Sequence, residues 1–217
     1  MAIDQKRRQK KLMKKRRKDK ARKKRQGASV PYTLLSVRRK ILTSRELPIC
    51  ECLINPSWKE DGFATILLSR RQYDGSIVYG VYLVDILCLG LKNTFCDADT
   101  PQAMYERKIR SSINPKEELV ECSIGLAHHI IYGAIEFAAQ FGFAPQEDFE
   151  LSQYVLEDIN SIEPCEDIEF GKDGKPFYVS GPYDDVEYIT RELRSKAGDG
   201  NFDFAIGFDD AAFDEEA

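Results

Sequence analysis

The first 26 residues of this 217-residue chain are too uniformly cationic to build a hydrophobic core of their own. They hold fifteen Lys or Arg residues and two acids, Asp4 and Asp19, so their charge is near +13. The rest of the chain holds 17 basic and 34 acidic residues and is near −17, a division that the net charge of −4 hides. Like charges at every helical turn oppose a stable free helix. The sequence therefore predicts a disordered basic tail and linker over residues 1–29, a single domain over 30–208 and an acidic tail over 209–217.

Apolar runs and turn residues after the tail predict an α+β fold. Ile49–Ile54 has the composition of a short strand, and β-rich runs at residues 64–71 and 77–87 flank the dipeptide Asp74-Gly75. This arrangement is a strong short-range hairpin signal. We expect an antiparallel hairpin over residues 63–88 at the middle of a sheet of about five strands, with three to four helices packed against it.

Helical spacing and helix-end residues indicate several helices. Thr100-Pro101 has the pattern of an N-cap followed by Pro at the first position, and predicts a helix that ends near Ile113. Residues 122–141 carry apolar side chains at helical spacing. Three further helices are expected at residues 32–42, 148–159 and 183–196.

The C-terminal part of the chain contains a second turn signal. Gly171–Lys175 lies between two short apolar segments, residues 168–170 and 177–179, which predicts a second hairpin. Residues 202–208 are expected as a closing strand.

A secretory signal has an apolar stretch after its basic segment, and no such stretch follows here. No apolar run reaches the length of a membrane span. We therefore expect a cytoplasmic protein with no membrane partner. Its six cysteines are then expected as reduced thiols that act as small buried apolar groups. No two cysteines have the C-x-x-C spacing of a zinc or redox site, so we expect no metal and no cofactor.

The basic tail predicts binding to a nucleic acid, RNA more readily than DNA, with the ribosome as one candidate partner. Lys and Arg that neutralise phosphates release condensed counterions, which gives strong binding without sequence readout. The tail has no aromatic residue to stack on a base. The predicted contacts are Lys6, Arg7, Arg8, Lys10, Lys11, Lys14, Lys15, Arg16, Arg17, Lys18, Lys20, Arg22, Lys23, Lys24 and Arg25.

Three other interpretations of the tail stay open. It could lie on anionic lipid, although it lacks the Trp, Phe and Leu side chains that anchor such a helix. It could be a nuclear import signal. It could also rest on the acidic body of the same molecule, which is compatible with RNA binding.

Five residues in the body are candidates for catalysis. Asp85 interrupts an apolar strand, where a carboxylate needs a partner or a raised pKa; an ion pair with Lys92 or Arg70 is the simpler alternative. His128 and His129 are the only histidines, and either could be a general base or a hydrogen-bonded helix residue. Asp184 and Asp185 could bind a divalent cation, although capping of the following helix explains them more simply.

Several strings in the body resemble a bacterial family of conserved hypothetical proteins for which no activity, cofactor or catalytic residue is established. The similarity spans roughly residues 45–208 and implies one intact domain. It makes Asp85 and the Gly-Pro-Tyr-Asp-Asp turn worth testing, and it does not extend to the basic tail. The strings are Trp58–Ala64 (WKEDGFA), Gly80–Gly90 (GVYLVD and CLG), Gly171–Phe177 (GKDGKPF), Gly181–Asp185 (GPYDD) and Gly200–Phe204 (GNFDF).

These observations favour a non-catalytic RNA-binding or ribosome-associated protein. One alternative is a nucleic-acid hydrolase or modification enzyme to which the tail delivers substrate, and it requires the candidate side chains to share one pocket. The other alternative is a protein interaction module whose acidic C-terminus binds a basic partner.

Overall fold

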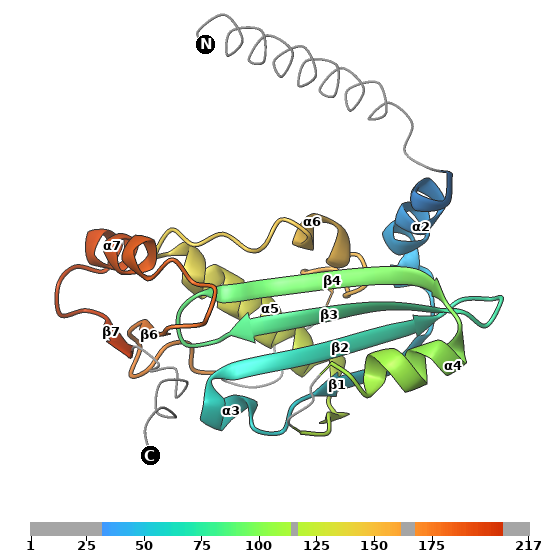
Figure 1. Ribbon diagram of the computed structural model, residues 1–217, viewed down its shortest axis with the longest axis horizontal. Coiled ribbons are helices and arrows are strands. Elements are labelled where there is room, and N and C mark those ends of the chain that lie inside the picture. Colours follow the sequence, from blue (N-terminus) through green and yellow to red (C-terminus); the bar gives the residue numbers. More distant parts are fainter. Residues whose placement is uncertain (1–31, 114–116, 162–167, 206–217) are drawn as a thin grey trace, which may run out of the picture. The chain divides into compact units, whose positions relative to one another are not determined.

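The structure is a computed structural model that describes residues 32–113, 117–161 and 168–205 (Figure 1). The chain divides into two units, residues 1–38 and 39–217, and each is treated by itself. Of the first unit only residues 32–38 are described, and they begin the predicted helix α2, Tyr32–Leu42. The predicted disordered tail over residues 1–29 and the predicted acidic tail over 209–217 lie outside the described residues.

Five antiparallel strands form the main sheet of the second unit, in the order β4-β3-β2-β1-β5. They are β1 Ile49–Ile54, β2 Phe63–Arg71, β3 Ile77–Asp85, β4 Gly90–Thr100 and β5 Val120–Glu121. The predicted α+β class and the predicted hairpin are both confirmed, because β2 and β3 pair from Phe63↔Asp85 to Arg71↔Ile77. Gly75 has a φ of 84° in the turn between them, a conformation that glycine adopts without strain.

The eleven-residue strand β4 was not predicted, because its Lys, Asn and Asp residues are types that are depleted in strands. Pairing with β3 stabilises it. On its buried side the Thr94 hydroxyl lies 2.8 Å from the Val81 carbonyl and 2.8 Å from Ser152 Oγ. The prediction that Thr100 caps a helix is wrong, since Thr100 ends β4. The helix begins at Gln102 as α4, Gln102–Met104, and continues as a π-helical segment, η2, Tyr105–Arg110.

Both faces of the sheet are covered. Strand residues alternate between faces, so Tyr82 and Val84 lie on the side of α5, Ile124–Ala139, which crosses the sheet in Figure 1. On the opposite face Tyr79 and Val81 pack with Tyr105 of η2. Helix α5 agrees with the predicted helix, and its N-cap is Ser123, whose Oγ accepts a hydrogen bond from Leu126 N at 3.0 Å.

The predicted helix over residues 148–159 is wrong over most of its length, because α6 spans only Phe149–Ser152. Arginine side chains bind the carbonyls that a longer helix would use for its own hydrogen bonds. Arg70 Nε donates to Val155 O at 2.7 Å, and Arg45 Nε donates to Leu156 O at 2.9 Å. Two short helical segments complete this part of the fold, η1 Ser44–Glu46 and α3 Trp58–Asp61.

The predicted second hairpin forms only at its turn, where Lys172 and Lys175 make a single antiparallel bridge; the segments 168–170 and 177–179 do not pair with each other. Strand β6, Phe177–Val179, pairs in parallel with β7, Asp203–Ala205, and α7, Val186–Lys196, connects them. Beyond the bridge in this glycine-rich turn the flanking segments bind the β3–β4 connection: Gly171 N donates to Ile86 O at 2.9 Å, and Phe177 N donates to Leu87 O at 3.0 Å. The closing strand is confirmed for Asp203–Ala205, while residues 206–208 lie outside the described residues.

Candidate functional site

The fifteen predicted phosphate contacts between Lys6 and Arg25 lie outside the described residues. Positive charge continues into the described part of the chain. Arg38 and Arg39 are exposed on α2, and neither forms an ion pair within the described residues. Lys40 pairs with Asp99.

Asp85 is buried at the end of β3, as its place in an apolar strand predicts, with 1% of its surface exposed. Its Oδ1 accepts hydrogen bonds from Leu87 N at 2.9 Å and Cys88 N at 3.0 Å. Its Oδ2 has no hydrogen-bond partner among the described residues. Burial raises the pKa of the Asp85 carboxyl to about 6, although the nearby backbone N–H groups and Lys92 oppose this change.

The carboxylate of Asp85 organises a turn where distant segments meet. Ile86 N donates to Gly62 O at 3.0 Å, and the carbonyls of Ile86 and Leu87 bind the glycine-rich turn described above. The simpler alternative for Asp85, an ion pair with Lys92 or Arg70, is wrong. Lys92 pairs with Asp184, and Arg70 pairs with Glu157 at 2.6 Å. The geometry of Asp85 is therefore that of a turn-forming residue.

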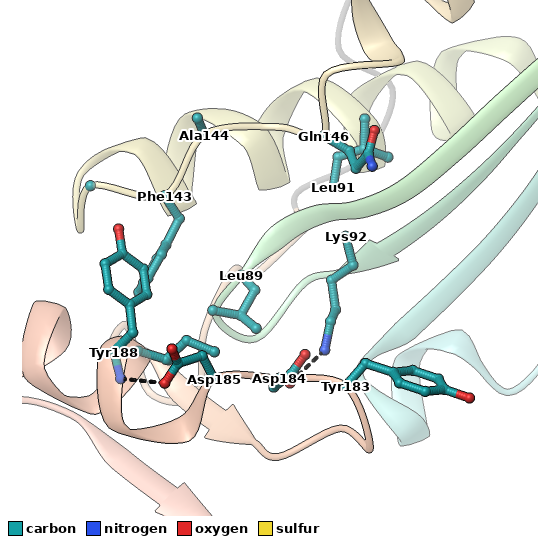
Figure 2. A pocket seen from close by; sticks show the side chains of 12 residues that line it. Leu89, Leu91, Lys92, Phe143, Ala144, Gln146, Tyr183, Asp184, Asp185 and Tyr188 are labelled. Carbon is teal, nitrogen blue, oxygen red and sulfur yellow. Dashed lines mark hydrogen bonds and ion pairs between the residues drawn. The ribbon is translucent and has the colours of Figure 1, made fainter. Parts of the chain in front are cut away.

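A cavity of about 430 Å³ lies between the β3–β4 connection, the segment after α5 and the start of α7 (Figure 2). Its lining is mostly apolar, with a small number of polar groups. The lining residues are Leu89, Leu91, Lys92, Gly142, Phe143, Ala144, Gln146, Tyr183, Asp184, Asp185, Tyr188 and Ile189.

The polar groups of this cavity bind one another. Lys92 points toward Asp184 in Figure 2, and Lys92 Nζ donates to Asp184 Oδ2 at 2.8 Å. Gly181 N donates to the same oxygen at 2.8 Å. Partial burial tends to raise the pKa of Asp184, but these two donors outweigh it and the pKa lies below its ordinary value. Asp185 Oδ1 accepts a hydrogen bond from Tyr188 N at 3.0 Å, so this carboxylate is the N-cap of α7.

The two histidines do not line this cavity. His128 is 7% exposed and its ring lies 4.4 Å from that of Tyr132. Burial lowers the pKa of His128, and the carbonyl and carboxylate of Asp158 oppose the change. The ring of His129 stacks on Phe170 at 6.1 Å. His128 Nε2 and His129 Nδ1 have no hydrogen-bond partners among the described residues.

The structure thus brings two of the five candidates, Asp184 and Asp185, to one cavity. Asp85 lies in the turn that supplies Leu89 to its wall, and both histidines lie elsewhere. Within the described residues, no group of three or more His, Cys, Asp or Glu side chains could hold a metal ion. Sequence reasoning missed Lys92 as the partner of Asp184, because 92 positions separate them and no local pattern links them.

Comparison with protein-family models, curated proteins and solved structures found no match to this chain. The resemblance to a bacterial family therefore stays a prediction from its strings. In the ranges that the structure describes, no helix has both the length and the apolar character needed to span a bilayer.

Proposed function

We propose that this protein is a non-catalytic RNA-binding protein of the cytoplasm, associated with the ribosome or with another large RNA. The observation that carries this proposal is the charge division along the chain: fifteen cations in the first 26 residues against a remainder near −17.

The physical basis is counterion release. Each Lys or Arg that neutralises a phosphate releases condensed cations, and this gain does not depend on the base sequence. The basic tail, which is the arm that contacts RNA in this proposal, has no aromatic side chain with which to read or stack on bases. It therefore supplies affinity, and the acidic body limits that affinity by repelling phosphates that are not held by the arm.

The enzyme alternative has less support in the described residues. It requires Asp85, a histidine and the pair Asp184 and Asp185 to share a pocket, but the cavity includes only the pair. Both of these carboxylates already bind partners, Lys92 and the backbone of α7.

A binding experiment with two full-length variants tests the proposal. In the first variant, all fifteen Lys and Arg residues up to Arg25 become Gln. In the second, the order of residues 2–26 is scrambled at constant composition. Fluorescence anisotropy with labelled single-stranded RNA, duplex RNA and duplex DNA measures the affinity of each after removal of copurified nucleic acid.

We expect the scrambled arm to bind RNA as the natural arm does, because charge and not order determines the contacts. The Gln variant should lose most of its affinity. If the scrambled arm fails while the natural arm binds, recognition depends on sequence in the arm and the proposed mechanism is wrong. If the Gln variant retains full affinity, the body is the RNA-binding surface.

A further inference from the structure

Two cysteines face each other across the edge of the main sheet. The antiparallel pairing Leu53↔Glu121 between β1 and β5 places Cys52 opposite Cys122, one residue further along. Cys122 N donates a hydrogen bond to Cys52 O at 2.9 Å, so the register extends to this pair. The two Sγ atoms are 3.5 Å apart.

This placement suits a covalent bond between the two sulfurs. A disulfide needs Cα atoms about 4.4–6.8 Å apart, and directly opposed residues of an antiparallel pair are about 4.5–5.5 Å apart. The bond length is about 2.05 Å, so the sulfurs of Cys52 and Cys122 need to approach by only about 1.5 Å. Rotation of the side chains supplies such a movement without a change of strand register.

The two thiols differ in access and in acidity. Cys52 is 6% exposed, whereas Cys122 is partly exposed. Contact with Cys122 and burial both raise the pKa of Cys52. Either sulfur can donate the hydrogen bond between them; when the Cys52 thiol donates, it stabilises the thiolate of Cys122 and lowers its pKa. Cys122 is thus the more accessible and the more nucleophilic sulfur of the pair.

The other described cysteines lack such a neighbour. Cys50 is exposed at the irregularity of β1, where the pairing shifts between Ile49 and Glu51, and it has no sulfur contact among the described residues. Cys88 is fully buried next to Asp85, and Cys96 is partly exposed on β4 with no sulfur contact among the described residues. The local geometry therefore singles out Cys52 and Cys122.

We propose that Cys52 and Cys122 are a reversible oxidation site, at which hydrogen peroxide converts the thiol pair into an intramolecular disulfide. The Cys122 thiolate attacks one peroxide oxygen, the O–O bond breaks, and hydroxide leaves, which gives the sulfenic acid of Cys122. The sulfur of Cys52 then displaces hydroxide from that sulfenic acid, and its thiol proton leaves with the hydroxide as water. Two thiols are oxidised and one peroxide is reduced to two waters. A dithiol reductant reverses the bond by exchange.

The disulfide fixes β5 to β1. Strand β5 has two residues and lies at the edge of the sheet, next to the segment that leads into α5. A bridge between positions 52 and 122 closes a long loop in the unfolded chain, so oxidation raises the melting temperature.

The test uses the full-length reduced protein and stoichiometric hydrogen peroxide. After quenching, thiols are counted in denaturant and the protein is digested without reduction for mass spectrometry. We expect two of the six thiols to disappear, a Cys52–Cys122 linked peptide to form without dimers, and dithiothreitol to restore both thiols. The melting temperature of the oxidised form should be higher than that of the reduced form.

Matched variants separate this site from general thiol oxidation. Cys50→Ser should form the same link as the natural protein, and Cys122→Ser should form none. In Cys52→Ala, Cys122 should stop at a sulfenic acid that dimedone traps. The proposal is overturned if another pair links first, if Cys122 is oxidised to sulfinic acid while Cys52 stays reduced, or if both thiols survive. The natural protein alone decides these outcomes if a variant does not fold.

Discussion

Replacement of the buried carboxylate by its neutral isostere, Asp85→Asn, tests how the β3–β4 turn is stabilised. The pKa of Asp85 is raised from 3.8 to about 6 by burial, so the folded state disfavours the ionised form. The contribution of the Asp85 carboxyl to the free energy of unfolding has its full value below pH 4. It decreases as the pH rises through 6, and above this range it is lost. A pKa change of this size corresponds to about 3 kcal/mol in the free energy of unfolding.

Asn at position 85 keeps an oxygen that can accept from the N–H groups of Leu87 and Cys88, and it carries no charge. We therefore expect Asp85→Asn to be more stable than the natural protein at pH 7.5, and its advantage to shrink by about 2 kcal/mol at pH 4.5. Asp85→Ala leaves both N–H groups without an acceptor and should be destabilised by about 2 kcal/mol at pH 7.5 and by about 4 kcal/mol at pH 4.5, because it also lacks the carboxyl that stabilises the natural protein at low pH.

Urea denaturation of the full-length proteins at pH 4.5, 6.0 and 7.5 measures these differences. Comparison of Asp85→Asn with the natural protein cancels the titration of all other groups, including His128. A difference in unfolding free energy that is the same at all three pH values contradicts the reasoning, because it means that Asp85 titrates alike in the folded and unfolded states.

Two further predictions concern the packing around this turn and the neighbouring strand. Arg70→Met should cost about 3–5 kcal/mol in urea denaturation, because Glu157 and several backbone carbonyls lose a buried donor; a cost below 1 kcal/mol means that water replaces the guanidinium. Gly90→Ala should cost more than about 2 kcal/mol, since its φ is 69° and the new Cβ lies 2.8 Å from Ala134 O. The control Gly75→Ala, with a similar φ in open space, should cost about 1 kcal/mol; equal losses for both glycines contradict the role of the Ala134 contact.

Local sequence patterns predicted the elements that are stabilised locally. The β2–β3 hairpin follows from Asp74-Gly75 between two apolar runs, and α5 follows from its apolar spacing. Strand β4 was not predicted because its conformation is determined by pairing with β3 and not by its own composition. The helix predicted over residues 148–159 failed in its C-terminal half, where the Arg70 and Arg45 side chains bind the carbonyls of Val155 and Leu156.

The candidate site shows the same division. The burial of Asp85 could be predicted, because it ends an apolar strand in which nearly every residue, on either face, is buried. The pairing of Lys92 with Asp184 could not, since it depends on how α7 packs on the β3–β4 connection. The contact between Cys52 and Cys122 likewise depends on the register of β1 with a two-residue strand.

The salt dependence of RNA affinity tests the central claim most directly. The logarithm of the association constant for single-stranded RNA should fall linearly with the logarithm of salt concentration, with a slope no steeper than about −10 if all fifteen cations contact phosphates. Replacement of those cations by Gln in the full-length chain should bring this slope close to zero and should remove most of the affinity for RNA. A natural protein that shows no salt-sensitive binding to RNA, or a Gln variant with an unchanged slope, contradicts the account.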